Sequence, residues 1–191
     1  MSEKNTTIRS LHDLGLAAWF GGSLMGAVGL NGAAAQADSP QERLELSSLG
    51  WARWAPVSAA AIGMHAVGGI GLIATNKSRL AGQPGATANT AVKAALTVAA
   101  AGLTAYAGAL GKKVYQHQDE GGVGATEPSP LASTELQKAQ KQLKAVQWAI
   151  PAVTGVLVVM GAQQGEQQRP QSLVRNQLSR LTSHVPDRLS A

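Results

Sequence analysis

The sequence predicts an all-α membrane protein, a polytopic four-helix bundle with an amphipathic C-terminal tail helix. Two observations support this fold class. Only 14% of the 191 residues are charged, against 45% hydrophobic, and the charges are confined to segments that separate four long uncharged stretches. These stretches are residues 14–37, 54–76, 94–111 and 145–163. Each is close to the roughly 20 residues that a helix needs to cross a hydrocarbon core about 30 Å thick.

A soluble helical bundle is the alternative fold class. The helices of a soluble bundle carry charged or polar residues along the face that meets water, whereas these stretches lack a charge over about five turns. The spans are rich in Ala, Gly, Ser and Thr, and the mean hydropathy of the chain is only −0.01. Such helices insert marginally, so we expect packing between them to stabilise the bundle.

Residues 1–163 are predicted to form the four-span membrane domain, and residues 164–191 a basic amphipathic tail. Apolar residues recur in the tail at intervals of four, three and four. They are Val174, Leu178, Leu181 and Val185. Arg175 and Arg180 lie off this stripe, as expected for a helix on an anionic membrane surface. A helix that docks on a partner, or a solvated tail, would share this pattern.

The charged segments between the spans are predicted to be connections. Asp38–Leu49 is expected to form the first outer loop. The segment Gln116–Ser129, rich in Gly and Pro, is expected to be irregular, with His117 a solvated histidine. Thr134 and Gln137 have the spacing of a capping box, which predicts one long helix from there into the fourth span.

The distribution of Lys and Arg predicts on which side of the membrane the termini lie. With four spans, these residues are slightly more numerous on the side that holds both termini, which places the termini in the cytoplasm. We expect the bacterial inner membrane. A competing interpretation is that the first span is a signal peptide cleaved after Ala35-Gln36-Ala37, which would leave three spans from Asp38 onwards.

Small residues recur at packing intervals in two of the spans. They are Gly22, Gly26 and Gly29 in the first span, and Thr97, Thr104 and Gly108 in the third. Such faces let membrane helices approach closely and form hydrogen bonds. We expect contacts within the bundle, and also with other membrane proteins or a second copy. Besides these partners and the lipid bilayer we predict none. Nucleic acid is discounted, because the basic residues lie on both sides of the membrane.

The sequence carries no catalytic signature. Cysteine is absent, which excludes thiolate metal sites and a cysteine nucleophile. Zinc-protease, serine-hydrolase, Walker A and Rossmann patterns are also missing. No Asp or Glu lies within a span for acid–base chemistry. The protein is therefore predicted not to be an enzyme, and no cofactor or metal is predicted.

His65 is the principal candidate for a polar site at membrane depth. It lies near the middle of the second span, on one helical face with Ser58, Ala61 and Gly68, and should face the bundle interior. It is expected either to bond a hydroxyl or carbonyl group of a neighbouring helix, or to bind a metal, haem, proton or substrate. A haem shared with His12 is disfavoured, because His12 lies about 14 Å along the axis from the middle of its own span.

Aromatic and amide side chains at the ends of the spans suggest anchoring. Trp51, Trp54 and Trp148 occupy predicted interfaces, where tryptophans form belts. Asn31 is expected to bond a backbone carbonyl or to cap its helix.

Residues 12–22, His-Asp-Leu-Gly-Leu-Ala-Ala-Trp-Phe-Gly-Gly, resemble the His, Trp and Gly-Gly opening of CopD-like and related four-helix bacterial membrane proteins. The resemblance implies a small helical membrane bundle, and such families are associated with copper handling. The chain departs from a copper-binding pattern, since Met25, Met64 and Met160 are isolated. The predicted function is a non-enzymatic accessory or scaffold component of a membrane complex. The alternative is a redox, metal-linked or transport protein with a polar site around His65.

Overall fold

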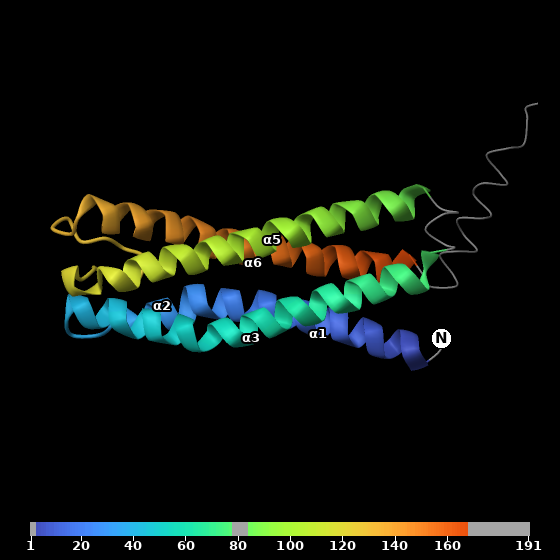
Figure 1. Cartoon of the computed structure of the whole chain (residues 1–191), viewed down its shortest axis with the longest axis horizontal. Coiled ribbons are helices and arrows are strands. Elements are labelled where there is room, and N and C mark those ends of the chain that lie inside the picture. The colour runs from blue at the N-terminus through green and yellow to red at the C-terminus, as the bar shows by residue number, and fades with distance from the viewer. Residues whose placement is uncertain (1–2, 78–83, 168–191) are drawn as a thin grey trace, which may run out of the picture. The chain divides into compact units, whose positions relative to one another are not determined.

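The computed structural model describes residues 3–77 and 84–167 of the chain. Contacts divide the chain into two units, Met1–Leu157 and Val158–Ala191. The described residues are all-α and form four long helical segments (Figure 1), which confirms the predicted all-α bundle of four helices. Most of the predicted tail, residues 168–191, lies outside the described residues.

The first helical segment contains a local change of helix type. It consists of α1 (Glu3–Met25), the π-helix η1 (Gly26–Leu30) and α2 (Asn31–Ala34). A π-helical turn widens the helix and shifts the positions of all later side chains around its axis. It therefore determines the direction in which Asn31, the first residue after the turn, faces.

The second segment, α3 (Pro40–Thr75), is longer than the sequence predicts. Ser39 caps it by accepting a hydrogen bond of 3.1 Å from the backbone N–H of Glu42, and Pro40 suits the first helical position. The predicted outer loop Asp38–Leu49 is therefore wrong. The charged residues before the second uncharged stretch were interpreted as a loop, but they belong to the helix. The first turns of α3 are amphipathic, with charged residues on the outside and Leu44 buried.

The remaining segments are α5 (Pro84–Gln116), the 3-10 turn η2 (Gln118–Glu120) and α6 (Thr134–Gln167). The long helix predicted from Thr134 is confirmed. Its cap differs by one position from the prediction, because the hydroxyl of Ser133 accepts the backbone N–H of Leu136 at 3.2 Å.

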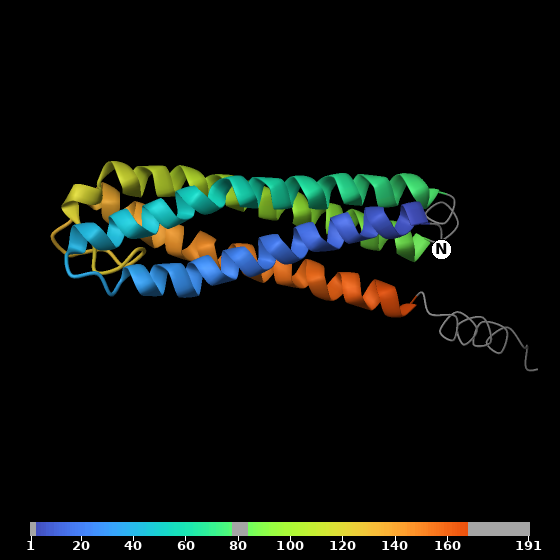
Figure 2. The ribbon, with the colours of Figure 1, turned by 90° about the horizontal axis from the view of Figure 1, so that it is seen from below.

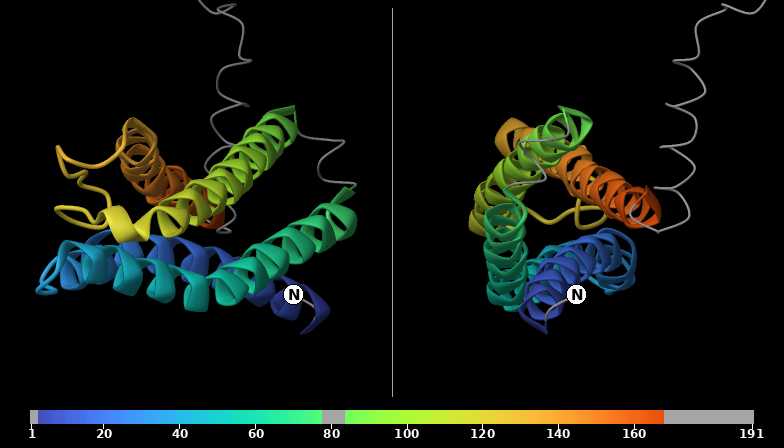
Figure 3. Two further views of the ribbon diagram at one scale, coloured as in Figure 1. Left: turned by 60° about the vertical axis from the view of Figure 1, so that its left-hand side comes forward. Right: turned by 90° about the vertical axis from the view of Figure 1, so that its right-hand side faces the viewer.

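Close packing joins α1 to α3 along their length (Figure 2). A Cβ atom added at Gly15 would lie 2.5 Å from the backbone nitrogen of His65, and one added at Gly68 would lie 2.5 Å from that of His12. Only glycine fits at both contacts. Figures 2 and 3 show the connection 35–39 at the same end of the bundle as the segment 117–133.

Buried side chains from all four segments form the core, and α5 contributes Ala100, Leu110 and Val114. The largest side chains that are fully buried are Trp19, Leu44, Leu136, Gln140 and Thr154. Large apolar side chains also face outward; Val67 is 62% exposed, Ile70 68% and Val98 72%. All four segments are long and apolar enough to cross a membrane. The architecture is that of a multi-pass membrane protein.

Candidate functional site

His65 lies inside the bundle, as predicted. It is 4% exposed, and Ser58, Ala61 and Gly68 on the same face of α3 are also buried. Its Nδ1 is 3.1 Å from the backbone oxygen of His12, and its Nε2 is 3.3 Å from Oγ1 of Thr97. The interpretation in which His65 bonds a carbonyl and a hydroxyl group of neighbouring helices is confirmed.

The expected separation in depth between His12 and His65 is wrong. Their ring centroids are 4.1 Å apart, and the rings are tilted by 39°. The prediction placed the middle of the first span near Gly21, but α1 begins at Glu3, and the glycine contacts at Gly15 and Gly68 bring the start of α1 beside His65. His12 also lies beside Asp13, whose Oδ1 is 2.9 Å from Nδ1 of His12.

The stacked arrangement offers few donors to a metal. The two rings lie one over the other rather than facing each other across an ion, and both ring nitrogens of His65 contact protein oxygens. Within residues 6–77 and 87–163, no group of three His, Asp or Glu side chains is placed to hold a metal ion. The geometry fits a polar packing contact between helices.

Two threonines of α5 form hydrogen bonds with neighbouring helices. Thr97 contacts His65, and Thr104 accepts a hydrogen bond of 3.1 Å from the indole nitrogen of Trp19. Thr104 in turn donates to the backbone oxygen of Ala100 at 2.9 Å. Trp19 is 1% exposed, so this contact satisfies a buried donor. The predicted packing role of both threonines takes the form of polar contacts.

The glycines predicted to pack have different surroundings. A side chain at Gly22 would overlap the ring of Trp54, and one at Gly26 the ring of Trp51, so both mediate contact with α3. Gly29 meets only Met25 of its own helical segment, and a Cβ at Gly108 would meet nothing within 4 Å.

These glycine contacts describe the surroundings of two tryptophans. Trp51 and Trp54 pack against the first helical segment and remain partly exposed, so their location at a membrane interface stays a prediction. Trp148 is 50% exposed, which fits the predicted anchoring role.

Asn31 connects three helices, a role that the sequence prediction missed. Its Nδ2 donates to Oε1 of Gln147 at 2.7 Å, while its Oδ1 accepts from Nε1 of Trp51 at 2.9 Å and from Oγ of Ser47 at 3.3 Å. Asn31, Ser47 and Gln147 are buried. In the sequence, the one indication of this contact was that two amide residues, Asn31 and Gln147, lie within uncharged stretches.

A cleft of about 940 Å³ lies between the helices of the first unit, and Ser58 lines it. Tryptophans and small residues dominate the lining, including Trp19, Trp51, Trp54 and Gly108. His65 is not part of the lining. The predicted polar site is therefore divided, because Ser58 faces the cleft while His65 faces α1 and α5.

The segment 117–133 packs on the ends of the helices rather than forming a loose connection. Arg43 of α3 donates to the backbone oxygen of Val123 at 3.1 Å, and the N–H of Gly122 donates to the backbone oxygen of Pro40 at 3.0 Å. Nε2 of Gln140 of α6 donates to the backbone oxygen of Gly124 at 3.1 Å. The segment is irregular, as predicted, but it is also a folded cap.

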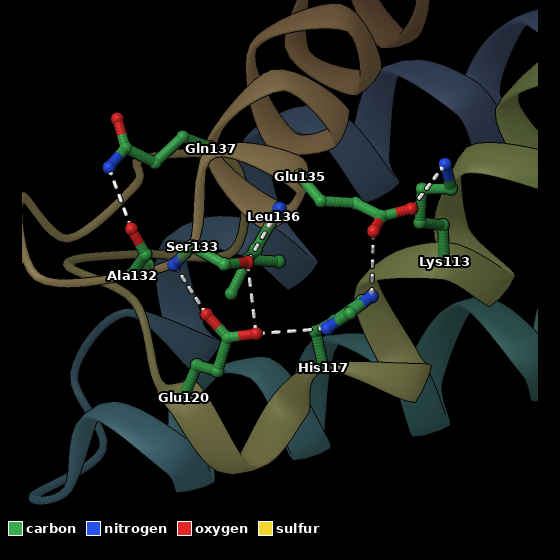
Figure 4. A network of polar contacts seen from close by, with 8 residues as sticks. All are labelled: Lys113, His117, Glu120, Ala132, Ser133, Glu135, Leu136 and Gln137. Carbon is green, nitrogen blue, oxygen red and sulfur yellow. Dashed lines mark hydrogen bonds and ion pairs between the residues drawn. The ribbon is translucent and has the colours of Figure 1, made fainter.

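His117 lies in a polar network that joins this cap to two helices (Figure 4). Its Nδ1 is 2.9 Å from Oε1 of Glu120, and its Nε2 is 3.9 Å from Oε2 of Glu135. Glu135 pairs with Lys113 at 2.8 Å, and Glu120 accepts the hydroxyl of Ser133 at 3.0 Å. His117 is therefore a partly exposed surface histidine that is held by carboxylates rather than freely solvated. One of these carboxylates, Glu120, is near it in sequence, but the other, Glu135, belongs to α6 and was not predictable from the sequence around His117.

Two carboxylates of the cap have lowered pKa values. A hydrogen bond from the backbone N–H of Ser133, with further hydrogen bonds from its hydroxyl and from His117, lowers the pKa of Glu120. Partial burial acts to raise the pKa of Glu127, but the hydrogen bond and charge of Lys144, 2.9 Å away, outweigh it and lower that pKa. Both groups are held in the charged form.

The predicted membrane-surface residues Arg175 and Arg180 lie outside the part of the chain that the structure describes. Comparison with known proteins gives no match to a family, a curated protein or a solved structure.

Proposed function

We propose that the protein is a non-enzymatic accessory or scaffold component of a membrane complex. It resides in the bacterial inner membrane with both termini in the cytoplasm, and a partner helix, from another membrane protein or a second copy, packs on α5. The exposed small-residue face of α5 carries this proposal.

The third candidate span is the least covered by the rest of the chain. Only 11% of its most apolar window is buried, against 28%, 22% and 33% in the other three. Its exposed residues include a series spaced by four, three, four and seven. These are Ala91, Ala95, Val98, Gly102 and Ala109. Such spacing places small side chains along one helical face, which permits close approach by another membrane helix.

Gly102 provides the sharpest test of this face. A Cβ there would meet nothing within 4 Å, so Gly102→Leu leaves the bundle intact and adds bulk only where the partner would pack. After purification in mild detergent, we expect the native chain to carry a stoichiometric membrane partner or to self-associate. Gly102→Leu should lose that association.

Gly63→Leu is the matched control, because Gly63 is exposed on α3 and its Cβ position is equally open. This variant should keep the association. A native chain that purifies alone as a monomer, or a Gly102→Leu variant that keeps its partner, would contradict the proposal.

The second candidate function is a redox, metal-linked or transport protein with a polar site around His65. The burial of His65 within a span supports it, since ionisable side chains within membrane spans are often functional. A proton or transport role fits this residue better than a metal role, because both of its ring nitrogens contact protein oxygens. The visible spectrum and metal content of the purified protein test it, together with growth of cells that carry His65→Leu. A colourless, metal-free protein whose His65→Leu variant supports normal growth would rule it out.

A further inference from the structure

The cleft of about 940 Å³ is lined by residues of α1, α3, α5, α6 and the cap, and these all belong to the first unit. Its volume lies at the upper end of the range of about 300 to 1,000 Å³ that small-molecule sites occupy. A space of this size is much larger than the voids of packed protein cores, few of which exceed a water molecule. We therefore expect a molecule from the surroundings to occupy the cleft.

The depth of the cleft corresponds to half of a bilayer. Along α5 its lining runs from Ala101 to Lys112 and Tyr115. Ala101 is near the middle of the candidate span Thr87–Gln116, and Lys112 is near its end. Lys112 lies eleven positions after Ala101, which is a rise of about 16 Å along the helix, about half of the roughly 30 Å hydrocarbon core.

The chemistry of the lining changes along this axis. At mid-span it is mainly apolar, with Trp19, Ile62 and Ala101 beside the hydroxyl groups of Ser58 and Thr104. The hydroxyl of Thr104 is already bonded to Trp19 and to the backbone of Ala100. At the loop end the lining includes the polar residues Ser48, Lys112 and Gln118, and also Glu45. The charges of Glu45 and Lys112 have opposite sign, so this end has no net formal charge.

Gln118 supplies an independent indication of a ligand at the loop end. Its Oε1 is buried and has no hydrogen-bond partner among the described residues. A buried carbonyl oxygen without a partner is costly, and because Gln118 lines the cleft, rotation of its side chain would let this oxygen meet a donor that enters the cleft. A hydrogen-bonding head would therefore be stabilised beside it.

The cleft is open toward the surroundings of the bundle. Leu49 on the α3 side is 47% exposed and Tyr115 on the α5 side is 57% exposed. Gly108 of α5 also lines the cleft and is exposed, with no atom within 4 Å of its Cβ position. A molecule in the surrounding membrane thus reaches the cleft laterally.

We propose that this cleft binds a lipid with one hydrocarbon chain and an uncharged hydroxyl-bearing head, such as a monoacylglycerol. The chain lies against Trp19 and Ile62 at mid-span. The head lies at the loop end near Ser48 and Gln118, where hydrogen-bonding groups are present and the formal charges cancel.

The tryptophans of the protein allow a direct measurement. Of its four, Trp19, Trp51 and Trp54 line the cleft and Trp148 does not. In a Trp148→Phe background, full-length protein in detergent micelles is titrated with dibrominated monoolein, whose bromine atoms quench nearby indoles. Saturable quenching is expected, with displacement by unlabelled monoolein and not by diacyl phosphatidylglycerol.

Two leucine substitutions separate filling of the cleft from a general effect of bulk. Gly108→Leu on α5 fills the cleft and should raise the concentration for half-quenching by about tenfold. Gly63→Leu on α3, which also points into open space but is not part of the lining, should bind like the parent. Linear quenching without saturation, equal quenching in both variants, or equal displacement by the diacyl lipid would overturn the proposal.

This inference is independent of the proposed partner. Loss of association in Gly102→Leu with unchanged quenching supports a scaffold that also binds lipid. If the Trp148→Phe protein shows no quenching but the association with the membrane partner is intact, only the proposed lipid site is overturned.

Discussion

Asn31 shows how one amide can join several helices inside a membrane bundle. An asparagine side chain offers two N–H donors and a carbonyl acceptor, and here they contact Gln147, Trp51 and Ser47. The π-helix η1 immediately precedes Asn31. Because a π-turn shifts the later side chains around the helix, it brings the amide to face both α3 and α6.

Replacing Asn31 should destabilise the bundle. Asn31→Leu leaves Gln147, Trp51 and Ser47 without their shared partner, and an unsatisfied buried group costs about 1–3 kcal/mol. We expect the unfolding free energy in detergent micelles, followed by circular dichroism, to fall by about that amount.

The double variant Asn31→Leu with Gln147→Leu should be less destabilised than the two single effects added together, since it removes both partners of one bond. As a control, Gln142→Leu removes only the exposed contact with Tyr106 and should change stability by less than about 0.5 kcal/mol. A loss as large in Gln142→Leu as in Asn31→Leu would contradict the connecting role of Asn31.

Glu120 makes the cap sensitive to acid. Its pKa is lowered in the folded protein by Ser133 and His117, so its contribution to stability is present above the unfolded pKa of 4.5 and is lost as pH falls through the lower folded pKa. The thermal midpoint of the wild type should therefore fall in that acidic range, and Glu120→Gln should lower the midpoint at neutral pH and reduce the acid dependence.

Asp119→Asn is the matched control for Glu120→Gln. Asp119 is exposed and adjacent in the chain, and its hydrogen bond with Gln41 uses the backbone oxygen, which asparagine retains. The acid dependence of this variant should match that of the wild type. Identical pH profiles for Glu120→Gln and the wild type would show that the Glu120 network does not stabilise the cap.

At the scale of elements, glycine determines how closely α1 approaches α3. Gly68→Ala would place a methyl group 2.5 Å from the backbone nitrogen of His12, and backbone cannot move as readily as a side chain. Overpacking of this kind costs about 1–3 kcal/mol. Gly63→Ala on the same helix meets open space and should instead stabilise by about 0.5–1 kcal/mol through helix propensity. Opposite signs in chemical unfolding are expected, and equal signs would contradict the close contact.

The sequence predicted the four spans because uncharged stretches indicate lipid exposure, but it did not predict the lengths of the helices. Helices extend beyond the hydrocarbon when their wet ends are amphipathic, as in the first turns of α3 around Leu44. The inward face of His65 was predictable from helical periodicity. Its contact with His12 was not, because the axial shift between α1 and α3 depends on the fit at Gly15 and Gly68.

The cap and the cleft were beyond prediction for a related reason. Both depend on residues that are distant in sequence, such as Glu120 with Ser133, or Trp51 with the wall of α5. Single-residue patterns indicate which side chains are polar or small. They do not indicate which helices become neighbours, and that arrangement decides whether a tryptophan faces lipid or lines a cleft.

For the whole molecule, the arrangement of the four segments predicts on which side of the membrane each connection lies. The connection 35–39 and the cap 117–133 lie at one end of the bundle (Figure 2), and the last residue described after α3, Lys77, follows its other end. The protein has no cysteine, so in a single-cysteine variant a thiol reagent can label only the introduced residue. Asp38, Lys77 and Asp119 are exposed and suit a membrane-impermeant maleimide.

With the proposed cytoplasmic termini, Asp38→Cys and Asp119→Cys should be labelled in spheroplasts, and Lys77→Cys only after the membrane is permeabilised. The cost of moving a polar connection through hydrocarbon keeps each site on its own side. The reverse pattern would invert the proposed orientation while preserving the four spans. Labelling of Asp38→Cys and Asp119→Cys from opposite sides would contradict the paired connections, and with them the four-span arrangement that places the cleft in one half of the bilayer.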